Sequence, residues 1–142
     1  MIVIDANLLL YAYNRSAPAH ADAKAWFERT LSHSEPVGIP WQSISAFIRI
    51  ATNPSLPDSL QMQDAVAVVH QWLTRPQVQA LAPGDLHWTI YRQMLIEGQV
   101  RGPLTSDAQL AALTIEFGGT LHTTDRDFTR FPGLRWVNPL HT

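Results

Sequence analysis

A chain of 142 residues fits one folded domain, and this one is 46% hydrophobic, only 15% charged and carries a formal net charge of −2. Such a composition excludes a disordered chain, which has more charge and fewer apolar residues. The sequence has no cysteine, so disulfide scaffolds, thiolate metal sites and cysteine nucleophiles are excluded. We therefore expect a single domain over residues 1–142, located in the cytosol.

The first residues have the features of neither a signal peptide nor a membrane anchor. Ile2–Ile4 is followed at once by Asp5, without the basic lead and the apolar stretch of about 7 to 15 residues that a signal peptide needs. No run in the sequence approaches the roughly 18 apolar residues of a membrane helix. We expect no association with a membrane.

Short apolar runs alternate with longer segments of helical periodicity along the chain. Ile2–Ile4 is a β-branched run that ends at Asp5, and Asn7 then precedes an apolar segment, a pattern typical of a buried strand that leads directly into a helix. Pro54 and Gly98 mark the ends of two later helices. The predicted strands cover residues 2–4, 37–39, 78–81, 120–123 and 134–137, and the predicted helices cover residues 8–11, 16–31, 40–51, 62–73, 84–98 and 106–117, with a turn or short helix over 125–131.

This alternation decides the predicted fold class. Strands separated by helices of about 10 to 15 residues are typical of right-handed βαβ units, which make the strands parallel and cover both faces of the sheet. Ser106 is the predicted N-terminal cap of the helix before the fourth strand. We predict an α/β fold, a three-layer α/β/α sandwich around a short parallel sheet of about four to five strands.

Four acidic residues are expected to meet at one edge of this sheet. Asp5 follows the first predicted strand and Asp125 follows the fourth, so both lie at carboxyl ends, where open parallel sheets bind their ligands. Asp107 lies in the first turn of a predicted helix, where the helix dipole favours an anion. Asp127 follows two residues after Asp125. Three separated segments therefore place carboxylates near one another.

Such a cluster favours a divalent cation. Two like charges about 4 Å apart repel by about 4 kcal/mol at an effective dielectric constant near 20, and a cation removes this penalty. Ligation by oxygen alone suits Mg²⁺ or Mn²⁺, and neither cysteine nor a pair of histidines at metal-binding spacing is present for zinc. These ions activate water and stabilise a leaving oxygen, which are the requirements of phosphodiester hydrolysis.

Each acid also has a purely structural interpretation. Asp5 is in a position to cap a helix, Asp107 to supply charge at a helix N-terminus, and the segment from Asp125 to Asp127 to form a solvated turn with an ion pair to Arg126. Only the joint placing of all four favours a functional site.

Several segments in a fixed order resemble a known family. Residues 2–7 (IVIDAN) resemble a strand-Asp-x-Asn opening, residues 106–112 (SDAQLAA) an Asp-Ala-x-x-Ala-Ala helix, and residues 123–128 (TTDRDF) a Thr-x-Asp-x-Asp-Phe ending. Residues 40–54 are similar to a subgroup of the same family. Together these segments resemble the PIN-domain ribonucleases, specifically the VapC toxins of VapBC toxin–antitoxin systems.

The resemblance implies a Mg²⁺- or Mn²⁺-dependent endoribonuclease, the toxin of a type II toxin–antitoxin system. Asp5, Asp107 and Asp125 would bind the metal, Asp127 would support it, and a metal-activated water would attack the RNA phosphate. The resemblance also implies a homodimer and a VapB-like antitoxin that blocks the site.

The chain departs from the family pattern at one position. The family usually has a glutamate on the helix that begins here at Pro40, yet no acid lies between Glu35 and Asp58. Gln42 and Ala46 lie four residues apart and share a helix face, so either could take that place. Gln42 offers a carbonyl oxygen but no charge. This departure leaves open an alternative, a catalytically weak PIN module that acts by binding RNA or a protein.

Other polar residues are candidates for supporting roles. Asn7 could hydrogen-bond a metal-bound water or the phosphate, or merely cap the first helix, and Thr123 could orient Asp125 or be an ordinary strand residue. Scattered arginines are candidates for phosphate contacts, without a firm assignment: Arg49, Arg101, Arg126 and Arg130.

A third interpretation makes Asp5 a phosphoryl acceptor, as in phosphatases and receiver domains. A haloacid-dehalogenase-type phosphatase would have an aspartate at Asn7, and a receiver domain would have a lysine near the site. Lys24 is the only lysine and belongs to the predicted second helix, so the sequence argues against this interpretation.

Composition favours association with a partner. Low charge and five tryptophans suit an interface, although core packing is the expected role of the four tryptophans on predicted helices, Trp26, Trp41, Trp72 and Trp88. A helical apolar stripe is a candidate surface for a homodimer or a partner segment, with ordinary core packing as the alternative: Met62, Ala65, Val66, Val69, Trp72 and Leu73.

Overall fold

The computed structural model describes residues 1–140, which form a five-stranded parallel sheet in the order β3-β2-β1-β4-β5. The strands are β1 (Ile2–Ile4), β2 (Val37–Pro40), β3 (Val78–Leu81), β4 (Thr120–His122) and β5 (Trp136–Val137). The helices are α1 (Ala6–Tyr13), α2 (His20–Ser32), α3 (Trp41–Ala51), α4 (Met62–Leu73), α5 (His87–Glu97) and α6 (Leu104–Glu116), with a 3-10 helix η1 (Arg126–Arg130).

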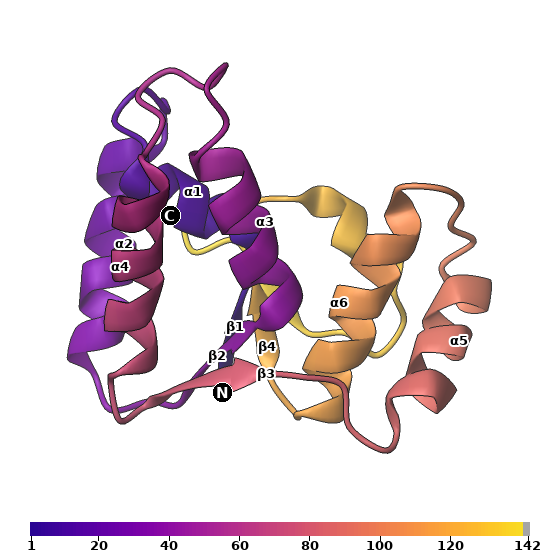
Figure 1. Ribbon diagram of the computed structural model, residues 1–142. Coiled ribbons are helices and arrows are strands. Elements are labelled where there is room, and N and C mark those ends of the chain that lie inside the picture. The colour runs from indigo at the N-terminus through magenta and orange to yellow at the C-terminus, as the bar shows by residue number, and fades with distance from the viewer. Residues whose placement is uncertain (141–142) are drawn as a thin grey trace.

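The elements form three layers. Helices α1 to α4 lie on one side of the sheet and α5 and α6 on the other (Figure 1). Successive strand residues point to opposite faces, so Val3 packs among residues of α5 and α6 whereas Ile4 packs among residues of α1 to α4. Because both faces are covered, both kinds of position are apolar. The predicted α/β/α sandwich with a parallel sheet is confirmed.

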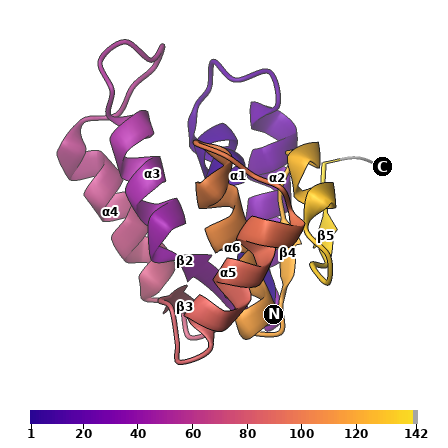
Figure 2. The same cartoon turned by 90° about the vertical axis from the view of Figure 1, so that its right-hand side faces the viewer.

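The strand order creates a switch point beside β1. The chain first adds β2 and β3 on one side of β1, and β4 and β5 then add on the other side, with β5 at the far edge (Figure 2). Residues that follow β1 and β4 therefore lie side by side at the carboxyl edge, where such sheets bind ligands.

Several predicted helix starts are wrong by a few residues. The first helix is capped by Asp5, whose Oδ1 accepts a hydrogen bond from the Ala6 N–H at 2.7 Å, so Asn7 is not the cap. Helix α6 begins at Leu104 directly after Pro103, which leaves Ser106 inside its first turn rather than at its cap. The helix expected from residue 16 begins at His20, and that expected from residue 84 begins at His87.

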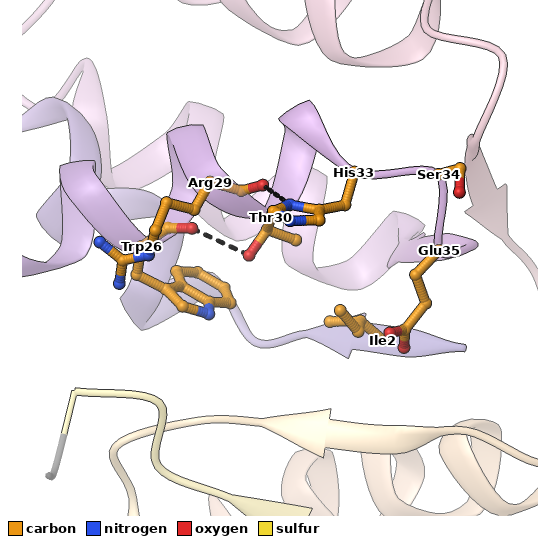
Figure 3. Close-up of a pocket in the computed structure, with 7 residues that line it drawn as sticks. All are labelled: Ile2, Trp26, Arg29, Thr30, His33, Ser34 and Glu35. Carbon is orange, nitrogen blue, oxygen red and sulfur yellow. Dashed lines mark hydrogen bonds between the residues drawn. The ribbon is translucent and has the colours of Figure 1, made fainter.

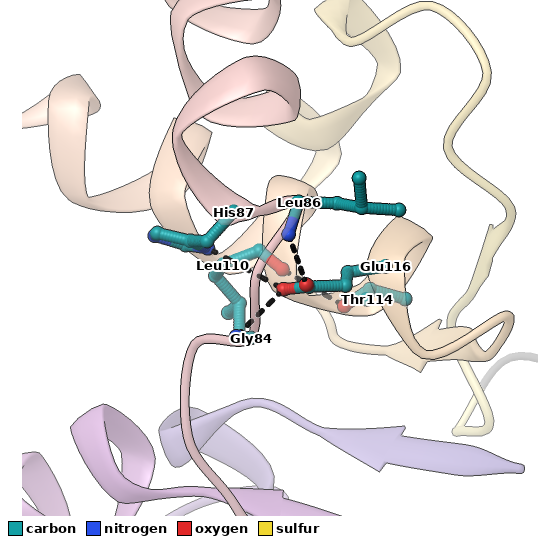
Figure 4. Close-up of polar contacts among 6 residues, drawn as sticks. All are labelled: Gly84, Leu86, His87, Leu110, Thr114 and Glu116. Atoms are coloured by element: carbon teal, nitrogen blue, oxygen red, sulfur yellow. Dashed lines mark hydrogen bonds and ion pairs between the residues drawn. The ribbon is translucent and has the colours of Figure 1, made fainter.

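A buried carboxylate fixes the start of α5 against the end of α6 (Figure 4). Glu116 accepts hydrogen bonds from the backbone N–H groups of Gly84 and Leu86, both at 3.0 Å. A Cβ atom on Gly84 would lie 2.6 Å from Glu116 Oε2, so a larger residue here would displace the carboxylate from this position. This contact holds the outer helix α5 in position from its first residue.

The tryptophans divide between core and surface. Trp26 and Trp72 are 6% and 1% exposed, as expected for core residues, and the Trp72 Nε1–H donates to the Tyr13 hydroxyl at 2.9 Å. Trp41 and Trp88 are 51% and 64% exposed, so core packing is the wrong role for these two. Within residues 1–140, no helix combines the length and the apolar character that crossing a bilayer requires.

Candidate metal centre

The pairing of β1 with β4 brings the first and last acidic segments together. Ile4 is in register with His122, and the Asp5 N–H donates to the His122 carbonyl at 3.1 Å. The next residues along both strands, Asp5 and Thr123, therefore emerge at the same point of the carboxyl edge.

Thr123 connects two of the four acids. Its hydroxyl donates a hydrogen bond to Asp5 Oδ2 at 2.8 Å and accepts one from the Asp125 N–H at 3.0 Å. Thr123 itself is completely buried, and both contacts are partly buried. Thr123 orients Asp5 and the backbone of Asp125 and is not a passive strand residue.

Asn7 bridges from α1 to the segment after β4. Its Nδ2 donates to Thr124 Oγ1 at 3.0 Å and to Thr123 Oγ1 at 3.4 Å. Its Oδ1 is buried without a hydrogen-bond partner among residues 1–140, which is a costly arrangement for a polar atom. Sequence analysis missed Thr124, because its partner lies 117 positions away and no local pattern connects the two.

Three of the acids form a compact cluster. Asp107, Asp125 and Asp127 each offer one carboxylate oxygen, and these oxygens all lie within 4.8 Å of one another. The Asp127 N–H also donates to Asp125 Oδ1 at 2.9 Å. Asp5 lies outside this triplet, although its charge acts on Asp107. The structure thus brings Asp127, predicted only to support the metal, into one cluster with Asp107 and Asp125, whereas Asp5 lies beside that cluster.

The electrostatics of the cluster match a cation site. The pKa of Asp107 is raised to about 6, mainly by burial and then by the charges of Asp125, Asp5 and Asp127, against an opposing effect of Arg130. Burial also raises the pKa of Asp5, against the hydrogen bonds from Thr123 and Ala6 that lower it. Carboxylates that resist ionisation in each other's presence are stabilised when a cation replaces the proton. These carboxylate oxygens fit a hard divalent ion.

Gln42 contacts the same edge from α3. Its Nε2 donates to the Ser106 carbonyl at 3.3 Å, one residue before Asp107. Ala46 lies one turn further along α3 and is half-buried. The helix that usually carries the family glutamate therefore reaches the first turn of α6, with Gln42 as its contact residue.

A pocket of about 410 Å³ lies at the opposite, amino-terminal edge of the sheet (Figure 3). It is lined by Ile2 at the start of β1, by Trp26 and Arg29 of α2, and by residues 33–35 before β2. Trp26 also stacks on His122 with ring centroids 5.7 Å apart. None of the four acids lines this pocket. The candidate site is therefore identified by the convergence of its carboxylates and not by this pocket.

A comparison with family models matches residues 2–134 to the PIN domain. The chain belongs to the PIN-domain family. Over 141 residues, it is 39% identical to ribonuclease VapC33 of Mycobacterium tuberculosis, with 99% of both chains covered. It is 36% identical to ribonuclease VapC43 of the same species, over 99% of this chain and 96% of that one. The resemblance to VapC toxins is confirmed.

Solved structures share the fold of this PIN domain. VapBC2 of Rickettsia felis, crystallised with a promoter DNA fragment, matches with a TM-score of 0.71 at 17% identity over 97% of this chain and 98% of that chain. VapC20 of Mycobacterium tuberculosis, a toxin that cleaves the sarcin-ricin loop, matches with a TM-score of 0.66 at 18% identity, with 95% and 99% coverage. The phosphoryl-acceptor interpretation is set aside, since Lys24 lies on α2 at 4.0 Å from Glu28.

Proposed function

We propose that this PIN domain is a Mg²⁺- or Mn²⁺-dependent endoribonuclease, the toxin of a type II toxin–antitoxin system. The observation that carries the proposal is the convergence of Asp107, Asp125 and Asp127 beside Asp5, in a chain related over its full length to VapC ribonucleases. The substrate is RNA, the site of action is the cytosol, and the partners are a second copy of the chain and a VapB-like antitoxin.

In this proposal, Asp5, Asp107 and Asp125 hold the metal and Asp127 supports it. When bound, a divalent cation lowers the pKa of water and acts as a Lewis acid toward a phosphate oxygen. Thr123 keeps Asp5 and the Asp125 backbone in place through its two hydrogen bonds. Asn7 holds the segment after β4 against α1 through its hydrogen bonds to Thr124 and Thr123.

Purified protein with and without Mn²⁺ or Mg²⁺ tests the proposal. We expect the wild type to cleave RNA only with added metal, and Asp5→Asn and Asp107→Asn to lose this activity while remaining folded. Asp107→Asn is the cleaner of the two, because Asp5 also caps α1. Cleavage at wild-type rates by either variant would overturn the assignment of that residue.

One observation favours a second candidate function, a catalytically weak PIN module that binds RNA or a protein. Gln42 occupies a face where the family usually has a carboxylate, and its amide donates to the Ser106 carbonyl. RNA binding without cleavage, under any divalent metal, would support this alternative.

Partner binding has a separate test. We expect expression of the chain alone to arrest cell growth, and co-expression with a neighbouring VapB-like antitoxin to restore growth and yield a stable complex. Growth arrest that persists in Asp107→Asn would argue that toxicity does not come from RNA cleavage.

A further inference from the structure

Arg130 lies on the same side of η1 as one of the clustered acids. A 3-10 helix has about three residues per turn, so side chains three positions apart eclipse one another. In η1, this spacing places Arg130 in line with Asp127, a member of the acid cluster. Arg126 precedes Asp127 directly and therefore points to a different side of the same helix.

The guanidinium of Arg130 is anchored by a backbone group. Its Nη1 donates to the Gly98 carbonyl at 3.4 Å, at the C-terminal end of α5. Gly98 leaves no room for a side chain, because a Cβ there would lie 2.6 Å from the Met94 carbonyl oxygen and 2.7 Å from the Phe131 ring. The last turn of α5 has no basic residue of its own, so Arg130 supplies a cation from another element where the helix dipole favours one.

Arg130 does not pair with the acids beside it. Within residues 1–140, no carboxylate lies within 4.0 Å of its nitrogens. Its place one 3-10 turn after Asp127 sets the guanidinium on the side of η1 that carries a cluster acid. A guanidinium has five N–H donors, and only one is used by Gly98. Arg130 is an exposed residue, so N–H groups not used by Gly98 are accessible to a ligand.

We infer that Arg130 is a substrate-binding residue, which grips a phosphate of the RNA strand next to the phosphate held at the acid cluster. This inference rests on the proposed ribonuclease function. A strand with one phosphate at the acids presents neighbouring phosphates on either side, and the planar fork of arginine binds phosphate oxygens in pairs. A fixed arginine beside the metal would set the register of the strand.

The competing explanation is that Arg130 only caps α5. Both roles use the guanidinium, but they predict different consequences of its removal. Loss of a cap alone lowers the stability of the fold and, through it, the affinity for every ligand equally. Loss of a phosphate contact weakens RNA binding, while removal of a positive charge beside four carboxylates leaves cation binding unchanged or stronger.

RNA binding is best measured in an Asp107→Asn background, which blocks cleavage and reduces repulsion. We expect Arg130→Gln to weaken binding of a fluorescent single-stranded RNA by about tenfold and to reduce the salt-dependence slope by about one between roughly 50 and 200 mM salt. Arg130→Lys keeps the charge, and its RNA affinity should lie between those of Arg130→Gln and the protein with Arg130. The matched control Arg126→Gln, with the same loss of charge on the same helix, should change affinity by less than about twofold.

Mn²⁺ titration calorimetry of the same Arg130 and Arg126 variants, without the Asp107 change, completes the test. We expect Arg130→Gln to bind Mn²⁺ at least as tightly as the wild type. Equal RNA affinities and salt slopes for Arg130→Gln and Arg126→Gln would overturn the inference, as would a parallel loss of Mn²⁺ and RNA binding. If the wild type cleaves RNA but Arg130→Gln and Arg126→Gln bind RNA equally well, only the role of Arg130 is refuted. If the wild type neither binds nor cleaves RNA, the proposed function is refuted.

Discussion

The hydroxyl of Thr123 serves two acids at once, so its removal has a defined cost. In Thr123→Val, Asp5 Oδ2 loses a donor and the Asp125 N–H loses an acceptor, both in a partly buried setting. We expect the free energy of unfolding to fall by about 1–3 kcal/mol in urea titrations and metal-dependent cleavage to fall by at least about tenfold. Thr123→Ser keeps the hydroxyl and should retain most of the stability and most of the cleavage activity. Equal losses in the two variants would show that the methyl group matters instead.

The raised pKa of Asp107 predicts a pH-dependent stability of the metal-free protein. The carboxyl titrates at 3.8 in the unfolded chain and at about 6 in the fold. Between these values, the folded protein binds a proton that the unfolded chain has released, so stability falls as pH rises through this window and the full penalty applies above it.

Asp107→Asn removes this penalty. Because the site is partly open to solvent, we expect a gain on the order of 1 kcal/mol for the metal-free variant at about pH 8, and little difference from the wild type below about pH 4. Thermal melts across this range measure it. Added Mn²⁺ should stabilise the wild type more than the variant, and a variant less stable than the wild type at high pH would contradict the electrostatic account.

The positions of the acids follow from sequence better than their contacts do. Asp5 and Asp125 follow recognisable strands, and parallel strands must end at one edge, so their convergence is predictable. The hydrogen bonds of Asn7 to Thr123 and Thr124 depend on side-chain directions in two segments joined only by the fold. Metal ligation by Asp5, Asp107 and Asp125 stays a prediction.

At the scale of elements, helix α3 contacts the first turn of α6 through the hydrogen bond from Gln42 to the Ser106 carbonyl. We expect Gln42→Glu to tighten Mn²⁺ binding, because it places a carboxylate against Ser106, the residue before Asp107. Without metal, the same change sets an anion against the Ser106 carbonyl and should lower stability. Calorimetric titration and thermal melts measure the two effects.

Ala46→Glu provides the comparison one turn along α3. Unchanged Mn²⁺ affinity in Gln42→Glu, together with tighter binding in Ala46→Glu, would assign the glutamate position to Ala46. No change in either variant would mean that neither residue faces the metal.

The exact first residues of α5 and α6 could not be predicted from the local sequence. Ser106 has the side chain of a cap, yet α6 starts two residues earlier, and Pro103 is the residue at its N-cap. The start of α5 depends on Glu116, which lies 32 positions beyond Gly84. Periodicity therefore located the helices, whereas their first turns are set by neighbours distant in sequence.

At the scale of the whole molecule, exposed apolar residues occupy both outer layers. The predicted stripe on α4 divides, since Ala65, Val69 and Trp72 are core residues whereas Met62 and Val66 are each 53% exposed. On the opposite side, α5 exposes Trp88 and Ile96 at 64% and 74%. These side chains are candidates for the interface of a homodimer.

We expect a species of twice 15.9 kDa in sedimentation velocity at micromolar concentration. Val66→Lys on α4 and Trp88→Lys on α5 each add one charge to an exposed position and should spare the core. Dissociation by one of them assigns the interface to that layer. A wild-type monomer at micromolar concentration and above would contradict the dimer and leave the metal-site proposal intact.

The hydrogen bond from Thr123 to Asp5 joins residues 118 positions apart and depends on β4 pairing with β1. A growing chain that has emerged only as far as α6 contains Asp5 but lacks the strand and the threonine that position it. Long-range parallel pairing is also slow to form, because a large loop must close first. We therefore expect a nascent chain that ends after α6 to lack the assembled site, so that the proposed nuclease activity arises only when nearly the whole polypeptide has been made.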